Sequence, residues 1–247
     1  MRFAVLSDIH GNLWALEAVL KDAKRRGIHQ FINLGDSLYG PLKPLETYEL
    51  LRRVPVITIQ GNEDREIYEY GPGEAHPTLI YVIKELGEAP VQWLRSLPKT
   101  SLIADEIFAC HGIPDSDCVY LLEDITHGTP SVRDKAAILK YLNGIHNPVI
   151  LCGHSHIPRV LWLSSEQLIV NPGSVGWPAY DDDVPSYHAM QNYSPLASYA
   201  ILEKHEDAWQ ASLLKIPYDV DLAVAQARRQ GREDWAYWLK TGRVVKP

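Results

Sequence analysis

The first twelve residues place the strongest constraint on what this chain can fold into. Arg2–Ser7 contains a short apolar run, and it ends abruptly in the segment Asp8-Ile9-His10-Gly11-Asn12. A continuous apolar run closed by polar residues is typical of a strand buried on both faces of an α/β sheet. Ligands gather at the carboxyl ends of such strands. Alternate side chains of an extended chain point the same way, so we expect Asp8 and His10 to converge on one point.

The same ending recurs along the chain. Four further apolar runs are followed by a glycine together with Asp, Asn or His: Phe31–Leu34 before Gly35-Asp36, Val56–Gln60 before Gly61-Asn62-Glu63-Asp64, Ile107–Cys110 before His111-Gly112, and Val149–Cys152 before Gly153-His154-Ser155-His156. Helical spacing separates the first three runs, over Leu13–Arg26 and about Leu45–Arg53. This alternation with short connections predicts parallel βαβ units.

Further elements follow from periodicity and turn residues. We predict helical structure over Tyr68–Leu97 and Val132–Leu142, a strand at Leu102-Ile103 paired with Ile107–Cys110, a hairpin of Val160–Leu163 and Leu168–Val170 across Ser164-Ser165-Glu166, strands over Tyr199–Leu202 and Trp209–Ile216, and helices over Val220–Arg229 and Asp234–Lys240. Trp177–Ser198 has no clear period and is predicted to be a long loop.

Composition limits the possible classes of protein. The 247 residues are 46% hydrophobic and show no linker or repeat, so we expect one domain over residues 1–247 with closing helices from about residue 220. The net charge of −7 disfavours a nucleic-acid or anionic-membrane surface. We expect a cytoplasmic protein with no signal peptide or membrane span, and the odd number of cysteines without zinc-type spacing agrees with this.

Seven side chains at the strand ends are of metal-binding types: Asp8, His10, Asp36, Asn62, His111, His154 and His156. This mixed oxygen and nitrogen set suits Mn, Fe, Ni, Zn or Co. Seven ligands are too many for one ion with an open position, and they suit two ions about 3.5–4 Å apart with one bridging carboxylate. Taken singly, Asp8 or Asp36 could cap a helix, but their joint occurrence with the histidines favours metal binding.

In this order, the motifs Asp8-x-His10, Gly35-Asp36, Gly61-Asn62, His111-Gly112 and Gly153-His154-Ser155-His156 resemble those of the calcineurin-like metallophosphoesterases. The resemblance covers nearly the whole chain, and 171–176 and 216–220 resemble a bacterial single-domain phosphodiesterase branch. It implies an α/β fold, a four-layer α/β/β/α sandwich of mixed sheets, with a dinuclear site between the sheet edges.

The resemblance also implies roles for residues. Asp8, His10 and His156 would hold the first metal, Asn62, His111 and His154 the second, and Asp36 would bridge them. The implied reaction is hydrolysis of phosphate esters by in-line attack of metal-bound hydroxide, without a covalent intermediate. We expect a phosphodiesterase acting on a small molecule or nucleotide, with a phosphomonoesterase or protein phosphatase as the alternative. The acidic surface disfavours a nuclease.

One position departs from the family pattern. Most members have a histidine, acting as general acid or transition-state donor, where this chain has Glu63. A carboxylate repels a phosphoryl group unless it is protonated or turned away, and general acid catalysis contributes roughly 10²–10⁴-fold in rate. We assign catalytic roles to Asp36, Asn62 and Glu63, with a low-activity metal-binding scaffold or sensor as the alternative. Asp64 orients that histidine in the family. In this chain we expect Asp64 to be a partner of Arg65 or a backbone cap.

Aromatic residues gather in the predicted loop and near the end of the chain. Trp177 and Tyr180 are predicted to bind substrate together with Asn62, because their rings could stack on a nucleobase. The alternative is a loop that buries its rings. Trp235 and Trp238 lie three apart on a predicted helix, which favours core packing, with contact between copies in a homo-oligomer as the alternative.

Overall fold

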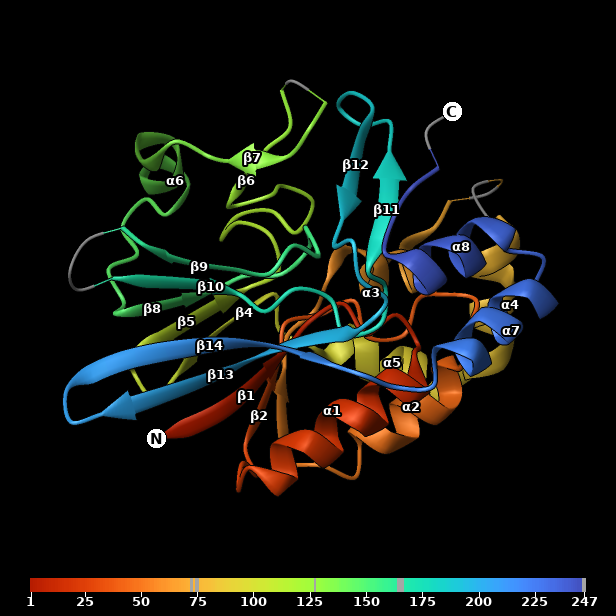
Figure 1. The fold of residues 1–247 in the computed structure, drawn as a ribbon, viewed down its shortest axis with the longest axis horizontal. Coiled ribbons are helices and arrows are strands. Elements are labelled where there is room, and N and C mark those ends of the chain that lie inside the picture. Colours follow the sequence, from red (N-terminus) through yellow and green to blue (C-terminus); the bar gives the residue numbers. More distant parts are fainter. Residues whose placement is uncertain (72, 74–75, 127, 164–166, 246–247) are drawn as a thin grey trace.

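Two five-stranded sheets lie face to face at the centre of the structure, a computed structural model that describes residues 1–71, 73, 76–126, 128–163 and 167–245 (Figure 1). The first sheet has the order β14-β13-β1-β2-β3 and the second β4-β5-β8-β10-β9. Their bounds are Arg2–Leu6 (β1), Phe31–Asn33 (β2), Val56–Thr58 (β3), Thr100–Ile103 (β4), Ile107–Cys110 (β5), Val149–Leu151 (β8), Arg159–Trp162 (β9), Leu168–Asn171 (β10), Ala197–His205 (β13) and Ala208–Ile216 (β14).

Both sheets are mixed. β1, β2 and β3 run parallel, as the βαβ pattern predicts, and the register places Val5 beside Ile32 and Ile32 beside Ile57. β13 adds to β1 antiparallel. In the second sheet β5, β8 and β10 are parallel, and β4 and β9 close its edges antiparallel. The parallel strands of each sheet therefore end at one common edge, where polar segments follow them.

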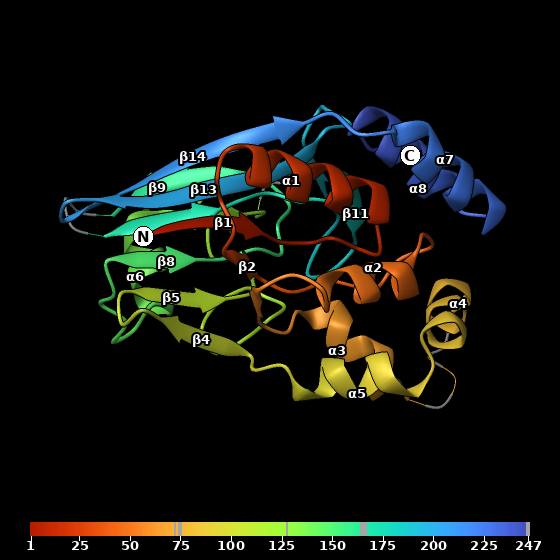
Figure 2. The same cartoon turned by 90° about the horizontal axis from the view of Figure 1, so that it is seen from below.

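Helices cover the outer faces and complete the four layers. α1 (Leu13–Arg25) and α2 (Pro44–Leu51) cover the first sheet, and α6 (Lys135–Tyr141) covers the second (Figure 2). Asn12 begins α1, because its Oδ1 accepts the amide of Ala15 at 3.2 Å. Apolar side chains fill the core between the sheets, and Val5, Leu151 and Leu202 are at 0% exposure. The predicted α/β/β/α sandwich is confirmed.

A third body of helices stands beyond the strand ends. It contains α3 (Asn62–Glu69), α4 (Pro77–Leu86), α5 (Glu88–Ser96), α7 (Val220–Arg229) and α8 (Glu233–Thr241). The indole of Trp235 on α8 stacks on that of Trp177 at 4.0 Å between ring centroids, and Trp238 lies in the same cluster. Both α8 indoles are at most 9% exposed, so the favoured prediction of core packing is confirmed for this pair. No helix in the described part of the chain is long and apolar enough to cross a membrane.

Three predicted segments differ in the structure. The expected loop over 177–198 holds a hairpin of β11 (Ala179–Asp182) and β12 (His188–Gln191), whose alternation was too short to detect. The helix expected from Val132 begins only at Lys135, because Ser131–Val132 (β7) pairs with Glu123–Asp124 (β6). The region Tyr68–Leu97 is broken into the end of α3 and the separate helices α4 and α5. The predicted turn at Ser164-Ser165-Glu166 lies outside the described residues.

We expect Gly35→Ala to destabilise the fold far more than Gly27→Ala. Both glycines have a positive φ, +102° and +74°, but a Cβ at Gly27 meets no atom within 4 Å, whereas one at Gly35 would lie 2.7 Å from the Cα of Gly61. Gly27→Ala should lower the free energy of unfolding by about 1 kcal/mol, and Gly35→Ala by more than about 3 kcal/mol. Urea denaturation measures both losses, and equal losses would contradict the close packing of the two corners.

Candidate metal centre

All seven predicted ligands lie at the ends of central strands. Asp8 and His10 follow β1, Asp36 follows β2, and Asn62 begins α3 after β3. His111 follows β5, and His154 and His156 follow β8. Because the two sheets face each other, these five corners meet, and the structure brings the side chains of all seven residues into one cluster.

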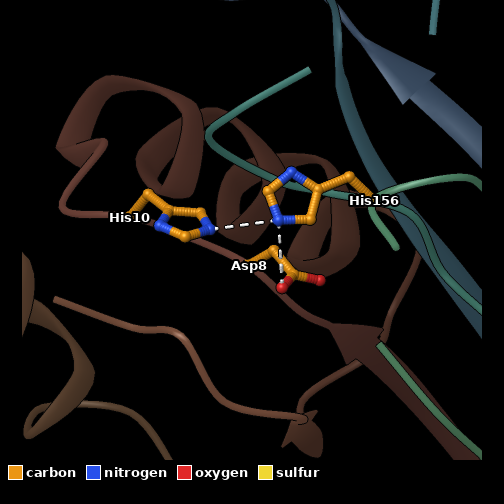
Figure 3. A group of neighbouring side chains, drawn as sticks. All are labelled: Asp8, His10 and His156. Carbon is orange, nitrogen blue, oxygen red and sulfur yellow. Dashed lines mark hydrogen bonds and ion pairs between the residues drawn. The ribbon is translucent and has the colours of Figure 1, made fainter. Parts of the chain in front are cut away.

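Asp8, His10 and His156 form the first group (Figure 3). Nε2 of His156 lies 3.3 Å from Oδ1 of Asp8 and 3.2 Å from Nε2 of His10. The side chains of Asp8 and His10 are completely buried, and that of His156 is 4% exposed. The three donors therefore face one point that bulk water does not screen.

Asp36, His111 and His154 form the second group. Nε2 of His111 lies 3.2 Å from Oδ2 of Asp36 and 3.1 Å from Oδ1 of Asn62. It also lies 3.9 Å from Oδ1 of Asp8, which links this group to the first. A third group combines His10 and Asp36 with Glu63. This third group shares His10 with the first group and Asp36 with the second, so Asp36 lies on the side of the second group that faces the first.

Backbone carbonyl groups determine which ring nitrogen of each histidine faces the cluster. Nδ1 of His10 donates to Tyr39 O (3.1 Å), Nδ1 of His111 to Leu34 O (2.7 Å), and Nδ1 of His156 to Trp177 O (2.7 Å). A neutral ring that donates from Nδ1 presents a lone pair at Nε2. The Nε2 atoms of His10 and His156 therefore face each other with two lone pairs, an arrangement that a cation between them satisfies.

The carboxylate of Asp8 supports the same conclusion. Its side chain is 0% exposed, and neither of its oxygens accepts a hydrogen bond from the described residues. Its nearest polar groups are Nε2 of His156 and Nε2 of His111, at 3.3 and 3.9 Å from Oδ1. A buried carboxylate that accepts no hydrogen bond is costly unless it is paired or binds a metal. The donor set and these unpartnered oxygens fit a divalent cation.

Five of the candidate ligands have strained backbones. Positive φ values occur at Asp8 (54°), His10 (50°), Asp36 (51°), His154 (66°) and His156 (59°). Such a conformation costs roughly 1–3 kcal/mol at each non-glycine residue and is typical of functional sites. The convergence of Asp8 and His10 is confirmed, but the predicted reason was wrong: the chain there is left-handed, not extended.

The charges of the cluster shift several pKa values. Burial lowers the pKa of His10 to about 3 and that of His154 to about 4, so both rings are neutral. Burial opposes the charged form of His111, but Asp36 outweighs it and raises the pKa of His111 to about 10. In the metal-free protein the proton on His111 therefore offsets the charge of Asp36, and a bound cation must displace that proton.

Asp64 is a backbone cap and does not pair with Arg65. Its Oδ1 accepts the amide of Ser37 at 2.9 Å, and its Oδ2 accepts that of Gly61 at 3.3 Å. Arg65 instead forms two hydrogen bonds of 2.9 Å with Asp117. In return, Oδ1 of Asp36 accepts the amide of Glu63 at 2.8 Å. These bonds tie the corner after β2 to the start of α3.

The two predicted substrate-binding rings are buried. Trp177 is 9% exposed and Tyr180 is 7% exposed, within the cluster that also holds Trp235. The hydroxyl of Tyr180 donates to the carbonyl oxygen of His154 at 3.0 Å. This placement favours the alternative in which the segment buries its rings, and their contact with substrate stays a prediction.

Sequence reasoning missed residues that support the cluster. Tyr120 stacks on the ring of His154 at 4.6 Å between centroids, and its hydroxyl lies 2.9 Å from that of Tyr180 and 3.0 Å from Nε2 of His188. No motif marks Tyr120, because its role arises from contacts between segments distant in sequence.

A polar cavity of about 240 Å³ lies beside the cluster. His111 contributes to its wall, together with Arg65, Lys99, Ser116 and Asp117. It provides space next to the candidate ligands for part of a bound molecule, and it contains both positive and negative side chains.

Comparison with known proteins agrees with this geometry. A model of the calcineurin-like phosphoesterase superfamily domain matches residues 1–193. An uncharacterized protein of Methanocaldococcus jannaschii is 26% identical over 258 residues, with 94% of each chain covered. The crystal structure of a metallophosphoesterase from Sphaerobacter thermophilus has a TM-score of 0.76 and 28% identity, covering 98% of this chain and 99% of that chain. The chain therefore belongs to the calcineurin-like phosphoesterase superfamily, a family of metal-dependent phosphoester hydrolases.

Proposed function

We propose that the chain binds two divalent metal ions at this cluster and hydrolyses phosphodiesters. The observation that most supports the metal ions is the pair of Nε2 lone pairs, on His10 and His156, that face each other at 3.2 Å beside the unpartnered oxygens of Asp8. Two groups of donors, linked by the third group of His10, Asp36 and Glu63, support two ions over one.

Each residue would have a defined part in this centre. The first ion would be held by Asp8, His10 and His156. The second would be held by Asn62, His111 and His154. Asp36 would lie between the ions, oriented by the amide of Glu63. Divalent cations in these positions would supply Lewis acid activation of a phosphoryl oxygen and of the attacking water. Asn62 would use its amide oxygen as a ligand and keep its amide N–H groups for a phosphoryl oxygen.

Charge and space support a diester substrate. A phosphodiester carries one negative charge and two substituents, whereas a monoester at neutral pH carries up to two charges. The carboxylate of Glu63 lies at the cluster and opposes the second charge. The cavity beside His111 offers room for one substituent. We propose a small phosphodiester or a nucleotide as the substrate class.

The cysteines support the proposed compartment. Cys110, Cys118 and Cys152 are all free thiols in the structure. We propose the reducing cytoplasm as the location, because disulfides are rare there.

Substitution of a candidate ligand tests the metal centre. After removal of metal with a chelator, we expect the wild-type protein to bind two equivalents of Mn²⁺ by calorimetry. His156→Ala removes the Nε2 donor and should lose one equivalent and at least about 10²-fold of phosphodiester hydrolysis. His29→Ala is the matched control, because His29 is exposed and belongs to no ligand group found among the described residues. Full binding by His156→Ala would contradict the assignment.

Substrate preference is tested separately. With saturating Mn²⁺ we expect kcat/KM for bis-p-nitrophenyl phosphate to exceed that for p-nitrophenyl phosphate at least about tenfold, because the site carries a carboxylate that opposes a dianion. Enzyme treated with chelator is the control and should hydrolyse neither. Faster turnover of the monoester would overturn the diester assignment and leave the metal centre standing.

A further inference from the structure

Glu63 lies beside the cluster but has no part in the centre formed by the seven proposed ligands. It lies in the first turn of α3, and its Oε2 is 3.0 Å from Nδ1 of His10. That nitrogen donates its proton to the carbonyl oxygen of Tyr39 at 3.1 Å instead. Oε2 of Glu63 is itself buried and accepts no hydrogen bond from any part of the chain that the structure describes. Oε2 therefore makes no hydrogen bond within the described residues, although Nδ1 of His10 lies beside it.

The surroundings of this carboxylate are unfavourable for a negative charge. The side chain is only 18% exposed, and a carboxylate oxygen of Asp36 lies within 4.8 Å of one of its own. A cation at this point would remove both costs at once, since it would pair the charge and saturate the oxygen.

Geometry identifies where such a cation would lie. Ligand atoms of His10, Asp36 and Glu63 all lie within 4.8 Å of one another. His10 also belongs to the group of Asp8, and Asp36 also belongs to the group of His111, so the third group stands between the other two. We propose that Glu63 is a further carboxylate ligand of the metal centre, on the ion shared by His10 and Asp36. This inference rests on the proposed metal centre.

An additional carboxylate ligand changes the chemistry of the centre. Asp8, Asp36 and Glu63 together neutralise three of the four positive charges of two divalent ions. The remaining single positive charge matches a monoanionic diester. A centre with a neutral histidine at position 63 would keep a larger positive charge and would attract a dianion more strongly. The added oxygen donor also shifts metal preference from Zn²⁺ toward Mn²⁺. Glu63 would therefore influence both which metal ion binds and which substrate charge is favoured.

Calorimetric titration of Mn²⁺ into metal-free Glu63→Gln tests the proposal. Glutamine keeps the shape but loses the charge, so we expect one of the two sites to weaken at least about tenfold. The melting temperature of the metal-free variant should equal or exceed that of the wild type, because an unpaired buried charge is removed. Glu66→Gln is the matched control: Glu66 lies on the same helix, pairs with His76 at 3.2 Å and belongs to no ligand group found among the described residues.

The possible outcomes separate the inference from the function on which it rests. Two sites of wild-type affinity in Glu63→Gln would overturn ligation by Glu63, and so would an equal loss in Glu66→Gln. No Mn²⁺ binding by the wild type would instead overturn the metal centre itself. Glu63→His should bind Zn²⁺ more tightly relative to Mn²⁺ than the wild type does, and an unchanged ratio would count against the proposal.

Discussion

The structure depends on an electrostatic imbalance at the point where five strand ends meet. Two histidine lone pairs face each other at 3.2 Å, and beside them lies a fully buried aspartate whose oxygens accept no hydrogen bond from the described residues. The proton on His111 offsets the charge of Asp36, and Nε2 of His111 also lies 3.9 Å from Oδ1 of Asp8. Divalent cations would satisfy the donors together, and their binding would therefore be coupled to the stability of this end of the sandwich.

The backbone that connects the strands also orients the histidine rings of the cluster. Carbonyl groups of Leu34, Tyr39 and Trp177, in corners other than those of the rings they bind, orient His111, His10 and His156. Moving one corner would therefore rotate a ring that belongs to another. The strained left-handed residues persist because the two sheets and the helices around them hold each corner in place.

The first turn of α3 is hydrogen-bonded to the corner after β2 and carries Glu63, which faces the candidate ligands. Asp36 accepts the amide of Glu63, while Asp64 accepts the amide of Ser37, so the corner after β2 and the helix cap each other. This reciprocal bonding gives Asp64 a structural role in which no histidine takes part. It also directs the carboxylate of Glu63 toward His10 and Asp36. There its proposed role is to bind a metal ion through its negative charge, not to donate a proton.

The sequence by itself determined the alternation of strands and helices, the parallel core of the first sheet and the seven residues that gather at the strand ends. Apolar runs and punctuating glycines are local signals, and five such endings in order leave few other arrangements. Only the tertiary structure decided the ring nitrogen that each histidine presents, the left-handed backbone of Asp8 and His10, the capping role of Asp64, the contacts of Tyr120, and the hairpin that replaces the expected loop after Trp177. Apart from the hairpin, whose strands are too short to show a clear alternation, these features depend on contacts between segments far apart in sequence, and no local pattern of residues records such contacts.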